Sequence, residues 1–474
     1  MPLILGTNSI KDTGYDVANS CMFDRASSQN LSRTFSSSPT NADKNTLSMW
    51  VKIVQSGTNR SAIFGDSNAG GVNFRTDDKI DFFNAGGFLR TTQVFKDISA
   101  WQHLVFTTDT TDGTADDRLK IYVNGVQVTS FDSRTNPSQN ADSKLGSASE
   151  HRIGANNDSA NFFGGYMAEV VFIDGQALAP TSFGEFDEDS PNIWKPKSVS
   201  GLTFGNNGFY LDFEDSSNLG NDVSGNNNDF TANNLSATNQ SEDTCTNNYA
   251  IMNSLLPLHS SDFRNGNLEW RTTTASHYYW ANSTIGVSTG KWYLEAKLQT
   301  AADHNYFGIS VDAPEDSSTF LGGGGGEGGH NDQYEWAWKS SDGKIYNNTD
   351  GGTAYGSTYG AGDILGMYLD LDNNKLYFAK NGTIQNSGTG ISITATSSLP
   401  NGVYFFAVGD GTSSNSVIWE VNHGNPSYGI SSANTDPEGH GTFEYSPNDG
   451  GSASFDSSAK DFFALNTKNL AEYG

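Results

Sequence analysis

Hydrophobic and polar residues alternate in short runs along most of the chain. Leu47, Met49, Val51 and Ile53 occupy every second position of one such run, so they would share one face of a β-strand. Similar runs, bounded by Gly, Asn and Asp, recur throughout, whereas the 3.6-residue period of an amphipathic helix is nearly absent. The pattern predicts an all-β protein made of sandwiches rather than of β–α–β units.

Two dipeptides mark hairpin turns. Asn124-Gly125 lies between two alternating apolar runs in the first half of the chain, and Asn381-Gly382 follows such a run in the second half. Asn-Gly favours the two-residue type I′ turn, because both central residues of that turn have a positive φ. We therefore expect a β-hairpin at each position.

The length of the chain indicates more than one domain. Its 474 residues exceed what a single hydrophobic core usually serves. A stretch rich in Asn, Ser and Thr has the composition of a polar linker between two β-sandwiches. The predicted parts are an N-terminal segment (1–20), a first sandwich with its trailing extension (21–235), the linker (236–260), a second sandwich (261–440) and a C-terminal segment (441–474).

Composition and net charge indicate how much of the chain is ordered and which classes of partner it is expected to bind. Hydrophobic residues make up only 35% of the chain, yet aromatic residues reach 12%, and disordered chains lack aromatic and β-branched residues. We therefore expect disorder only at linkers. The formal net charge is −27 and Lys and Arg form no basic patch, so we expect no nucleic-acid partner. The acidity suits either a crowded assembly that must stay soluble or a salty medium.

The cysteines and the N-terminus indicate the cellular compartment in which the protein is made. Cys21 and Cys245 are too few for a disulfide framework, and their spacing matches no metal motif. The N-terminus lacks a basic region, its apolar run is too short for a signal peptide, and no apolar stretch of about 18 residues follows. We expect a protein made in the cytoplasm without a signal peptide and without membrane insertion.

Four motifs follow one another in the first half. They are Leu47-Ser-Met-Trp50-Val-Lys, Trp101-Gln-His103-Leu-Val-Phe, the strand ending at Asn124-Gly125, and Gly165-Tyr-Met-Ala-Glu-Val-Val-Phe-Ile-Asp174-Gly175. In this order and spacing they resemble the laminin-G and pentraxin superfamily over residues 20–180. The resemblance implies a concanavalin-like jelly-roll sandwich, a fold often used to bind glycans or protein partners.

The second half carries a more specific set. Gly290-Lys-Trp292-Tyr-Leu-Glu295, Tyr306-Phe-Gly308-Ile, and the long run from Gly362-Asp363 to Asn381-Gly382 look like a SPRY domain. The resemblance implies a second jelly-roll sandwich that serves as a binding module without catalytic machinery.

The tandem order as a whole resembles structural proteins of tailed phages, especially marine ones. The joining motifs Asn207-Gly-Phe-Tyr-Leu-Asp-Phe-Glu-Asp and Asp222-Val-Ser-Gly-Asn-Asn-Asn-Asp-Phe fit that family. The resemblance implies a homo-oligomeric protein of the virion surface, as a tail or head fibre or a decoration. Its partners would be other virion proteins and host cell-surface polysaccharide. Three hypotheses stay open: noncovalent recognition of host glycan or of neighbouring virion proteins, a polysaccharide-cleaving glycoside hydrolase on the first sandwich, and purely structural capsid decoration.

The hydrolase hypothesis requires a pair of carboxylates. Laminarinase-type enzymes place acidic residues in an E-x-D-x-x-E pattern along one strand, and the nearest match is Glu185-Phe-Asp187-Glu-Asp-Ser190. Retaining hydrolysis needs two carboxyl groups about 5–5.5 Å apart, and a serine stands at the last acidic position. We therefore expect no enzymatic activity and no catalytic residues.

The resemblance to laminin-G domains raises one candidate cofactor, calcium. The aspartates that could supply oxygen ligands at a loop rim are Asp66, Asp109, Asp112, Asp174 and Asp187. No D-x-D-x-D-G loop occurs, so chance clustering is the favoured explanation and no cofactor is specified.

Six side chains are candidate contacts for a ligand or partner: Tyr278, Tyr279, Trp280, His330, Tyr355 and Tyr359. The first three are consecutive, so a strand cannot bury them all and at least one should be exposed or at an interface. Tyr355 and Tyr359 lie among Gly, Ser and Thr, and tyrosine supplies contact area at low entropic cost. Packing on their own sandwich is the alternative for each. His330 follows a glycine-rich stretch, residues 322–329, that we expect to be an exposed loop.

Overall fold

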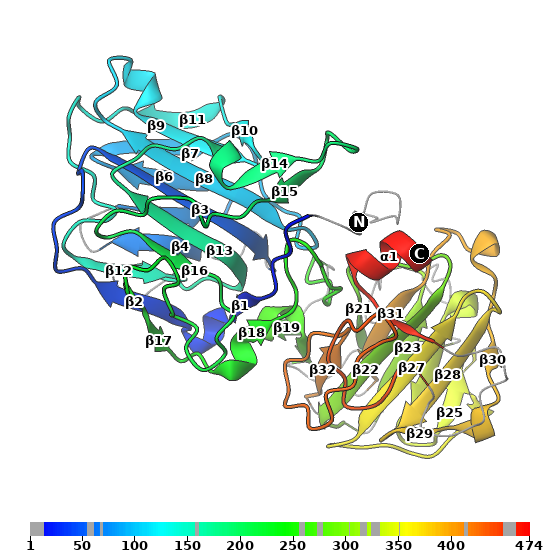
Figure 1. The fold of residues 1–474 in the computed structure, drawn as a ribbon. Helices are drawn as coiled ribbons and strands as arrows, with labels where there is room; N and C mark the ends of the chain where they lie inside the picture. Colours follow the sequence, from blue (N-terminus) through cyan, green and yellow to red (C-terminus); the bar gives the residue numbers. More distant parts are fainter. Residues whose placement is uncertain are drawn as a thin grey trace. The chain divides into compact units, whose positions relative to one another are not determined.

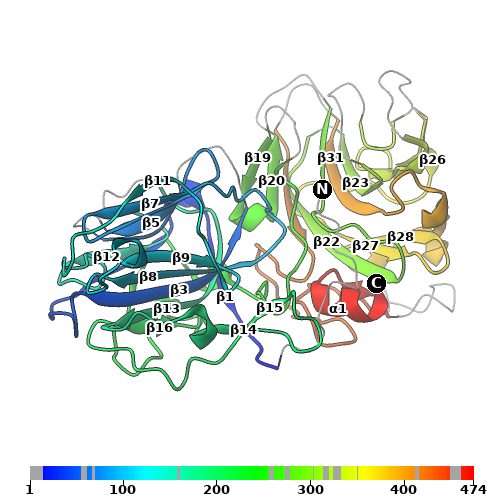
Figure 2. The same cartoon turned by 90° about the horizontal axis from the view of Figure 1, so that it is seen from above.

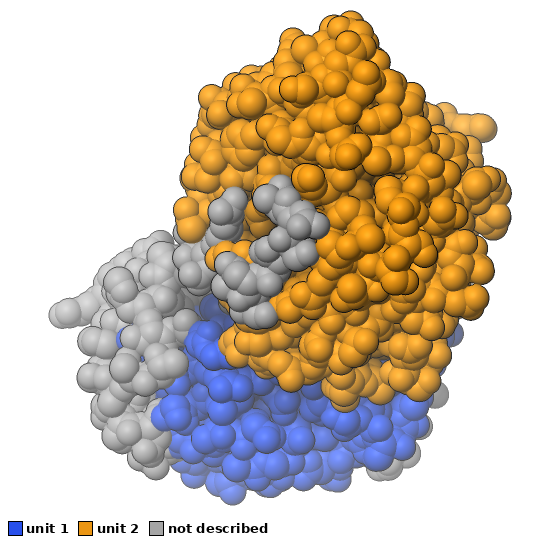
Figure 3. Space-filling view, turned by 90° about the vertical axis from the view of Figure 1, so that its left-hand side faces the viewer, with its two compact units in different colours: residues 1–11, 249–474 blue, residues 12–248 orange. Residues whose placement is uncertain are grey.

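The computed structural model describes residues 14–54, 61–66, 70–156, 161–255, 261–272, 278–302, 304–312, 320–323, 332–349, 351–411, 416–448 and 461–474. The chain forms two compact units (Figure 3). The N-terminal unit comprises residues 12–248. The C-terminal unit comprises residues 249–474, together with residues 1–11, which lie outside the described residues. Both are built almost entirely of antiparallel strands (Figure 1), which confirms the all-β prediction. No helix in the described ranges is long and apolar enough to span a bilayer.

Two large sheets form the N-terminal unit. Sheet A has the strand order β10-β9-β8-β3-β13-β1-β18, and β16 also pairs with β13. Sheet B has the order β11-β7-β6-β5-β4-β12-β2-β17. The strands of sheet A are β1 (Ser20–Phe23), β3 (Lys44–Ile53), β8 (Gln102–Asp109), β9 (Leu119–Val123), β10 (Val126–Gln127), β13 (Gly165–Asp174), β16 (Phe209–Leu211) and β18 (Gln240–Ser241). Those of sheet B are β2 (Asn30–Thr34), β4 (Ser61–Asp66), β5 (Gly71–Phe74), β6 (Ile80–Asn84), β7 (Gly87–Thr91), β11 (Phe131–Thr135), β12 (Glu150–Ile153) and β17 (Thr231–Asn233).

The core of the N-terminal unit lies between sheets A and B. Leu47, Met49 and Val51 of β3 are at most 1% exposed and belong to this core, as the alternation in the sequence predicts. Burying a side chain of this size stabilises the fold by about 1.5–3 kcal/mol. Cys21 lies in the same core, and both it and Cys245 are free thiols.

The chain after β13 covers the second face of sheet A. Figure 2 shows β14 on one side of sheet A and β5, β7 and β11 of sheet B on the other. The hairpin of β14 (Gly184–Phe186) and β15 (Trp194–Pro196) brings Trp194 onto this face, where its Nε1 donates a 3.0 Å hydrogen bond to Nδ1 of His103. Burial lowers the pKa of His103 to about 3, so its imidazole is neutral. Sheet A is therefore buried on both faces.

The predicted linker is wrong over residues 236–248, which belong to the N-terminal unit. Strand β18 pairs with β1, and Asp243 is fully buried. Its carboxylate accepts hydrogen bonds from Lys52 Nζ at 2.7 Å and from Trp101 Nε1 at 2.9 Å. Polar residues of this stretch accept hydrogen bonds from the buried Lys52 ammonium group. Composition alone does not distinguish that role from the role of a solvated linker.

The C-terminal unit also consists of two facing sheets. Sheet C has the order β19-β20-β32-β22-β27-β28-β29, with β30 beside β28 and β33 parallel to β22, and sheet D has the order β21-β31-β23-β24-β25-β26. The strands of sheet C are β19 (Ser261–Arg264), β20 (Glu269–Thr272), β22 (Lys291–Thr300), β27 (Ile364–Asp370), β28 (Lys375–Lys380), β29 (Thr383–Ile384), β30 (Ile391–Ser392), β32 (Ile418–Asn422) and β33 (Phe463–Ala464). Those of sheet D are β21 (Tyr279–Asn282), β23 (Asn305–Ser310), β24 (Trp336–Lys339), β25 (Lys344–Tyr346), β26 (Thr353–Ala354) and β31 (Phe405–Asp410).

The predicted C-terminal segment is part of the second sandwich. Strand β33 pairs with β22, and helix α1 (Thr467–Tyr473) follows it. Glu295 of β22 is fully buried and accepts hydrogen bonds from the backbone N–H groups of Glu444 at 2.9 Å and Tyr445 at 2.7 Å, and from the Tyr293 hydroxyl at 2.9 Å. Burial raises the pKa of Glu295 to about 7. The boundary expected at residue 440 is therefore no structural boundary.

Both predicted Asn-Gly turns are present. Asn124-Gly125 joins β9 to β10 with φ values of 47° and 79°, and Asn381-Gly382 joins β28 to β29 with φ values of 47° and 74°. In each turn the asparagine Oδ1 accepts a backbone N–H from a neighbouring strand, that of His103 at 2.8 Å or that of Ile364 at 2.9 Å. The same local chemistry thus fixes one hairpin in each unit.

Candidate binding surfaces

Three neighbouring strands of sheet B carry polar and aromatic side chains on the face that points away from the core. Val72, Phe82 and Leu89 are fully buried between the sheets, so their sequence neighbours lie on the opposite face. The outward residues of β5, β6 and β7, here called the Asn73 face, are Asn73, Asp81, Phe83, Phe88 and Arg90. Figure 2 shows β5 and β7 in an outer layer of the N-terminal unit.

A charge-balanced pair stands at the centre of the Asn73 face. Arg90 donates to both carboxylate oxygens of Asp81, from Nε at 2.8 Å and from Nη2 at 3.2 Å. Arg75 adds a third hydrogen bond at 3.3 Å. The hydrogen bonds to Asp81 raise the pKa of Arg90, and the two-point contact fixes the plane of its guanidinium.

Asn73 lies beside this pair and has a free amide. The strand register places it between Ala62 of β4 and Asp81 of β6. Its side chain is 4% exposed, and among the described residues no hydrogen-bond partner reaches its amide. Most polar side chains with so little exposure in proteins are hydrogen-bonded. The Asn73 amide is therefore a strong candidate for contact with a ligand.

Two phenylalanines border the polar row. Phe83 and Phe88 are directly opposite each other on β6 and β7, and both are half-buried. The tip of the Phe83 ring lies over Gly71, where an added Cβ would be 3.0 Å from Cζ. The Arg90 guanidinium carbon is 5.2 Å from the centre of the Phe88 ring. An apolar strip thus adjoins an amide and a neutral ion pair.

This combination suits a ring that carries hydroxyl groups. An amide both donates and accepts hydrogen bonds, as a sugar hydroxyl does, and an aromatic ring packs against apolar C–H groups. This face is not among the contact surfaces predicted from the sequence. Its signal is a polar residue at the outward position of three consecutive short strands, Gly-Val-Asn-Phe, Ile-Asp-Phe-Phe-Asn and Gly-Phe-Leu-Arg-Thr.

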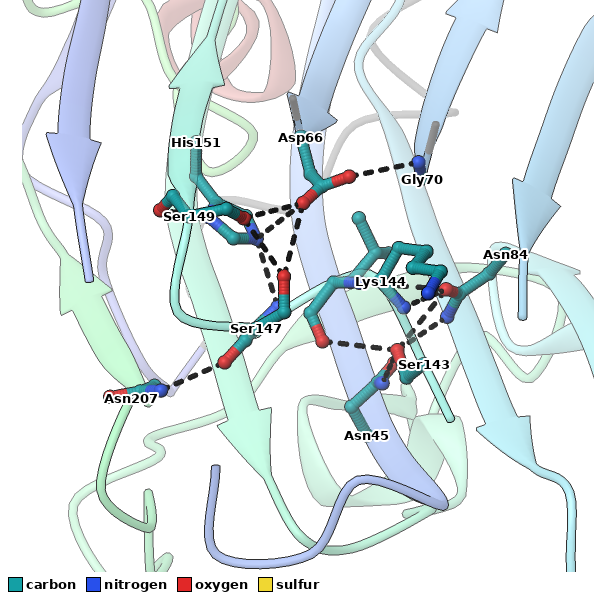
Figure 4. Close-up of polar contacts among 12 residues, drawn as sticks. Asn45, Asp66, Gly70, Asn84, Ser143, Lys144, Ser147, Ser149, His151 and Asn207 are labelled. Carbon is teal, nitrogen blue, oxygen red and sulfur yellow. Dashed lines mark hydrogen bonds and ion pairs between the residues drawn. The ribbon is translucent and has the colours of Figure 1, made fainter. Parts of the chain in front are cut away.

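A second polar cluster joins the end of β4 to the loop before β12 (Figure 4). The Asp66 carboxylate accepts hydrogen bonds from the hydroxyls of Ser147 at 3.2 Å and Ser149 at 2.7 Å, and from the N–H of Gly70 at 3.1 Å. His151 Nε2 lies 3.8 Å from the same carboxylate. Burial lowers the pKa of His151, so the imidazole is neutral and this contact is no ion pair.

Asn84 holds the adjacent part of the same loop. Its Oδ1 accepts the N–H of Lys144 at 2.8 Å, and its Nδ2 donates to the Ser143 hydroxyl at 2.8 Å (Figure 4). Asn84 and Asp66 thus tie the same loop to two different strands of sheet B. We assign this cluster a structural role.

The five aspartates considered for calcium do not form one site. Besides Asp66, each accepts a hydrogen bond of its own: Asp109 from Lys44, Asp112 from the N–H of Thr114, Asp174 from the N–H of Thr40, and Asp187 from Lys195. Within the part of the chain that the structure describes, no three His, Cys, Asp or Glu side chains are grouped as metal ligands. The expectation about cofactors stays a prediction.

The acidic motif considered for hydrolysis lies on the β14–β15 hairpin. Asp187 accepts the Ser190 N–H at 2.8 Å and is 3.1 Å from Lys195 Nζ. The hydrogen bond from Lys195 lowers the pKa of Asp187, which keeps this carboxyl ionised and unsuited to act as a general acid. Glu185 is exposed on the same hairpin.

The three consecutive aromatic residues of the C-terminal unit differ in solvent exposure, as expected. Tyr278 is 37% exposed, whereas Tyr279 and Trp280 are 2% and 1% exposed. Tyr279 belongs to the core between sheets C and D, and Trp280 lies in a cluster on the other face of sheet D. The prediction that at least one is exposed is confirmed, and Tyr278 is the member whose side chain can reach a partner.

Tyr278 extends an aromatic group on the outer face of sheet D. The Phe320 ring is 5.6 Å from the Tyr278 ring, edge to face, and is stacked on Tyr306 at 4.8 Å with an interplanar angle of 15°. It also meets Tyr346 edge-on at 5.7 Å, and the Lys339 ammonium lies 5.1 Å from the Tyr346 ring centre. This Tyr278 cluster is the candidate contact region of the C-terminal unit.

The other expected contact residues differ in exposure. Tyr359 is 6% exposed, and its hydroxyl lies within hydrogen-bonding distance of two carbonyl acceptors, those of Trp338 at 2.7 Å and Asn305 at 2.9 Å, so it packs on its own sandwich. Tyr355 is half-buried, and its hydroxyl accepts the N–H of Phe378 at 3.1 Å. His330 and most of the glycine-rich stretch lie outside the described residues.

The fold defines an all-β protein with two β-sandwich units. Residues 27–181 match the model of the concanavalin A-like lectin/glucanases superfamily, and residues 291–418 match the SPRY domain model. The chain therefore carries a concanavalin-like domain and a SPRY domain in tandem, as the sequence motifs indicate.

Curated relatives match a limited part of the chain. Ran-binding protein 9 of Danio rerio is 28% identical over 102 residues, which is 22% of this chain and 16% of that protein. The Ran-binding proteins 9/10 homolog of Drosophila melanogaster is 26% identical over 98 residues, 21% of this chain and 10% of that protein. The match thus spans less than a fifth of either relative's length.

Solved structures give weaker similarity. The SPRY domain of human HERC1 aligns with a TM-score of 0.27 and 15% identity, over 34% of this chain and 92% of that chain. A candidate carbohydrate-binding protein from Bacteroides ovatus aligns with a TM-score of 0.34 and 16% identity, over 46% and 59%. These similarities carry no argument about function.

Proposed function

We propose that the protein acts by noncovalent recognition of carbohydrate through the Asn73 face of its N-terminal unit. The observation that carries this proposal is the unpartnered Asn73 amide beside the Asp81–Arg90 pair and the two phenylalanines. Binding sites for small ligands combine apolar and aromatic surface with a few placed polar groups, and this face offers both. The match to a superfamily of lectins and glucanases supports the same class of ligand.

The proposal is tested with the full chain and soluble polysaccharides. Affinity electrophoresis through gels that contain β-glucans, mannans or bacterial exopolysaccharides should retard the protein in at least one of them. Bovine serum albumin, an acidic protein without this fold, should migrate unchanged in the same gels. Unchanged migration of the protein in every gel contradicts the proposal.

As the setting of this recognition we propose the surface of a tailed-phage virion, where several copies contact other virion proteins. The resemblance carried by the joining motifs around Phe209 and Asp222 supports this setting, and a homo-oligomeric array would raise avidity roughly 10²–10⁴-fold without new contacts. The SPRY domain and its Tyr278 cluster are assigned to partner contact. Immunogold electron microscopy of purified particles is the test, and particles without label contradict the setting.

A further inference from the structure

We propose that Glu169 is a proton-dependent clasp, which holds the segment before β1 to strand β13 in acid and loosens its hold as the pH rises past neutrality. Three features carry the proposal. A bulge in the strand directs the carboxyl group, two tyrosine hydroxyls meet that group, and the charged side chains that act on it are acidic.

The bulge in β13 sets the direction of the Glu169 side chain. The register of β13 with β3 shifts between Ala168 and Val171, and Glu169 has a φ of 49°. A residue with a Cβ rarely adopts this conformation inside a strand. Bulges often re-aim a side chain, and here the carboxyl group leaves the regular alternation of the strand.

Two tyrosine hydroxyls meet the carboxyl group of Glu169. The hydroxyl of Tyr210, on β16, lies 2.8 and 2.9 Å from its two oxygens, and that of Tyr15 lies 3.1 Å from Oε2. The two hydroxyls are 3.2 Å apart. Tyr210 is fixed, because β16 pairs with β13 and its ring is stacked on Phe204. Tyr15 precedes β1 and lies in no strand, so it is the partner that can move.

The number of protons decides how many of these three contacts are hydrogen bonds. An ionised Glu169 leaves only the two hydroxyl protons, and both point to the carboxylate because a charged acceptor forms the stronger hydrogen bond. The contact between the hydroxyls then holds no proton. A protonated carboxyl group supplies the third proton, so each contact can become a hydrogen bond. The arrangement with Tyr15 in place therefore matches the protonated form.

The charges around Glu169 favour the same form. Its side chain is 7% exposed, and no Lys or Arg in the described part of the chain forms an ion pair with it. Asp212 and Glu214 act on it as like charges, and the Cys245 thiol also interacts with it. Burial is the main cause that raises the pKa of Glu169 to about 7, and the two carboxylates add to the shift, whereas the tyrosine hydrogen bonds oppose it.

The direction of the pH effect follows from this raised pKa. Because the pKa of Glu169 lies above its ordinary value of 4.5, the closed clasp binds the proton more tightly than a released carboxyl group does. The contribution of the clasp is complete below about pH 4.5 and is lost as the pH rises through about 7. Val17 belongs to the same segment, and its N–H donates to Thr246 Oγ1 at 3.1 Å. Exchange of this N–H therefore reports how firmly the segment is held.

Hydrogen exchange of the full chain at pH 5 and pH 8, followed by mass spectrometry, tests the proposal. Labelling times are scaled to the intrinsic exchange rate at each pH, and a peptide from β3 is the internal reference. Glu169→Gln keeps the size of the side chain but cannot ionise, and Tyr15→Phe removes the moving hydroxyl. Glu188→Gln changes an exposed carboxyl group of the same unit and is the matched control. Thermal unfolding at both pH values reports whether each variant is folded.

Protection of the Val17 N–H should fall by about tenfold or more from pH 5 to pH 8 in the native protein and in Glu188→Gln, while the β3 peptide keeps its protection. Glu169→Gln should show no such fall, and Tyr15→Phe should be weakly protected at both pH values. Equal protection of the native protein at both pH values, or a tenfold fall that persists in Glu169→Gln, overturns the proposal. If Glu169→Gln does not fold, Tyr15→Phe decides, because a tenfold fall in that variant also overturns it.

Discussion

Lys52 and Asp243 form an ion pair with a 2.7 Å separation, and both side chains are fully shielded from solvent. Burial lowers the pKa of Lys52, and the Asp243 carboxylate opposes that shift. Asn248 Oδ1 accepts a second hydrogen bond from the same ammonium group at 2.7 Å. The pair joins the third strand of the N-terminal unit to its last residues, so a polar contact completes this sandwich.

We predict that Lys52→Met destabilises the N-terminal unit by about 3–5 kcal/mol, because it leaves the Asp243 carboxylate buried without its cation. The double variant Lys52→Met/Asp243→Asn should lose less than the sum of the single variants. Chemical denaturation measures the free energy of unfolding. Lys120→Met, which breaks a partly exposed pair on sheet A, is the control and should cost at most about 1 kcal/mol. Equal losses for both lysines would contradict the prediction.

A fragment of residues 1–248 should fold, whereas a fragment of residues 1–235 should not. The shorter fragment lacks β18 and Asp243, so β1 loses one of its two partner strands and Lys52 loses its counter-charge. Near-ultraviolet circular dichroism and amide hydrogen exchange of the two fragments provide the measurement. A cooperative unfolding transition in the shorter fragment would show that residues 236–248 are dispensable.

The free energy of unfolding of the C-terminal unit should depend on pH because of Glu295. Its pKa of about 7 in the folded protein lies above its ordinary value of 4.5 because of burial, so folding favours the protonated carboxyl. The contribution of Glu295 to the free energy of unfolding is complete below about pH 4.5 and is lost as the pH rises through about 7. A shift of this size corresponds to about 3 kcal/mol.

The measurement compares thermal unfolding at pH 5 and pH 8. The native protein should lose stability between these values, and Glu295→Gln, which cannot ionise, should show a smaller difference. Glu188→Gln changes an exposed carboxyl in the other unit and serves as the control. An unchanged difference in Glu295→Gln would mean that the carboxyl is ionised at both pH values.

We expect Gly125→Ala to be more destabilising than Gly86→Ala. Both glycines have a similar positive φ, 79° and 77°, so both substitutions share a conformational cost of about 1–2 kcal/mol. An added Cβ at Gly125 would lie 2.4 Å from the Trp194 ring, whereas nothing lies within 4 Å at Gly86. The difference in unfolding free energy between the two variants isolates the contact with Trp194. Equal losses for the two variants would show that the β14–β15 hairpin moves away from the added methyl group at little cost.

Purified protein should release no reducing sugar from any polysaccharide that it binds. Lys195 keeps the Asp187 carboxyl ionised, and Ser190 stands where the hydrolase pattern has an acid. A reducing-sugar assay over several hours, with a known glucanase as positive control, gives the measurement. Release that disappears in Asp187→Asn would favour the hydrolase alternative.

The sequence predicts the parts of the fold that local chemistry controls. The alternation around Met49 depends on the two-residue period of a strand, and the turns at Asn124 and Asn381 depend on positive φ. Both signals are complete within a few residues. For that reason the all-β architecture, both hairpins and the order of the two domains could be predicted before any tertiary contact was known.

The features that sequence analysis missed depend on distant partners. Asp243 lies in a stretch with linker composition, and its cation is 191 residues earlier in the chain. Glu295 sits in a recognisable motif, yet the backbone groups that it binds are about 150 residues later. The Asn73 face needs three strands in register before its polar row exists. Periodicity finds the strands, but pairing across the sheet decides which side chains become neighbours.

The pairing of β1 has a consequence for synthesis of the protein. Ser20 is opposite Ser241, and Cys21 is opposite both Met167 and Gln240. At about 5–20 residues per second, a ribosome needs roughly 10–40 s to travel from the first partner to the last. Sheet A therefore gains its β18 edge only after nearly the whole N-terminal unit has been synthesised, whereas β1 can pair with β13 about 70 residues earlier.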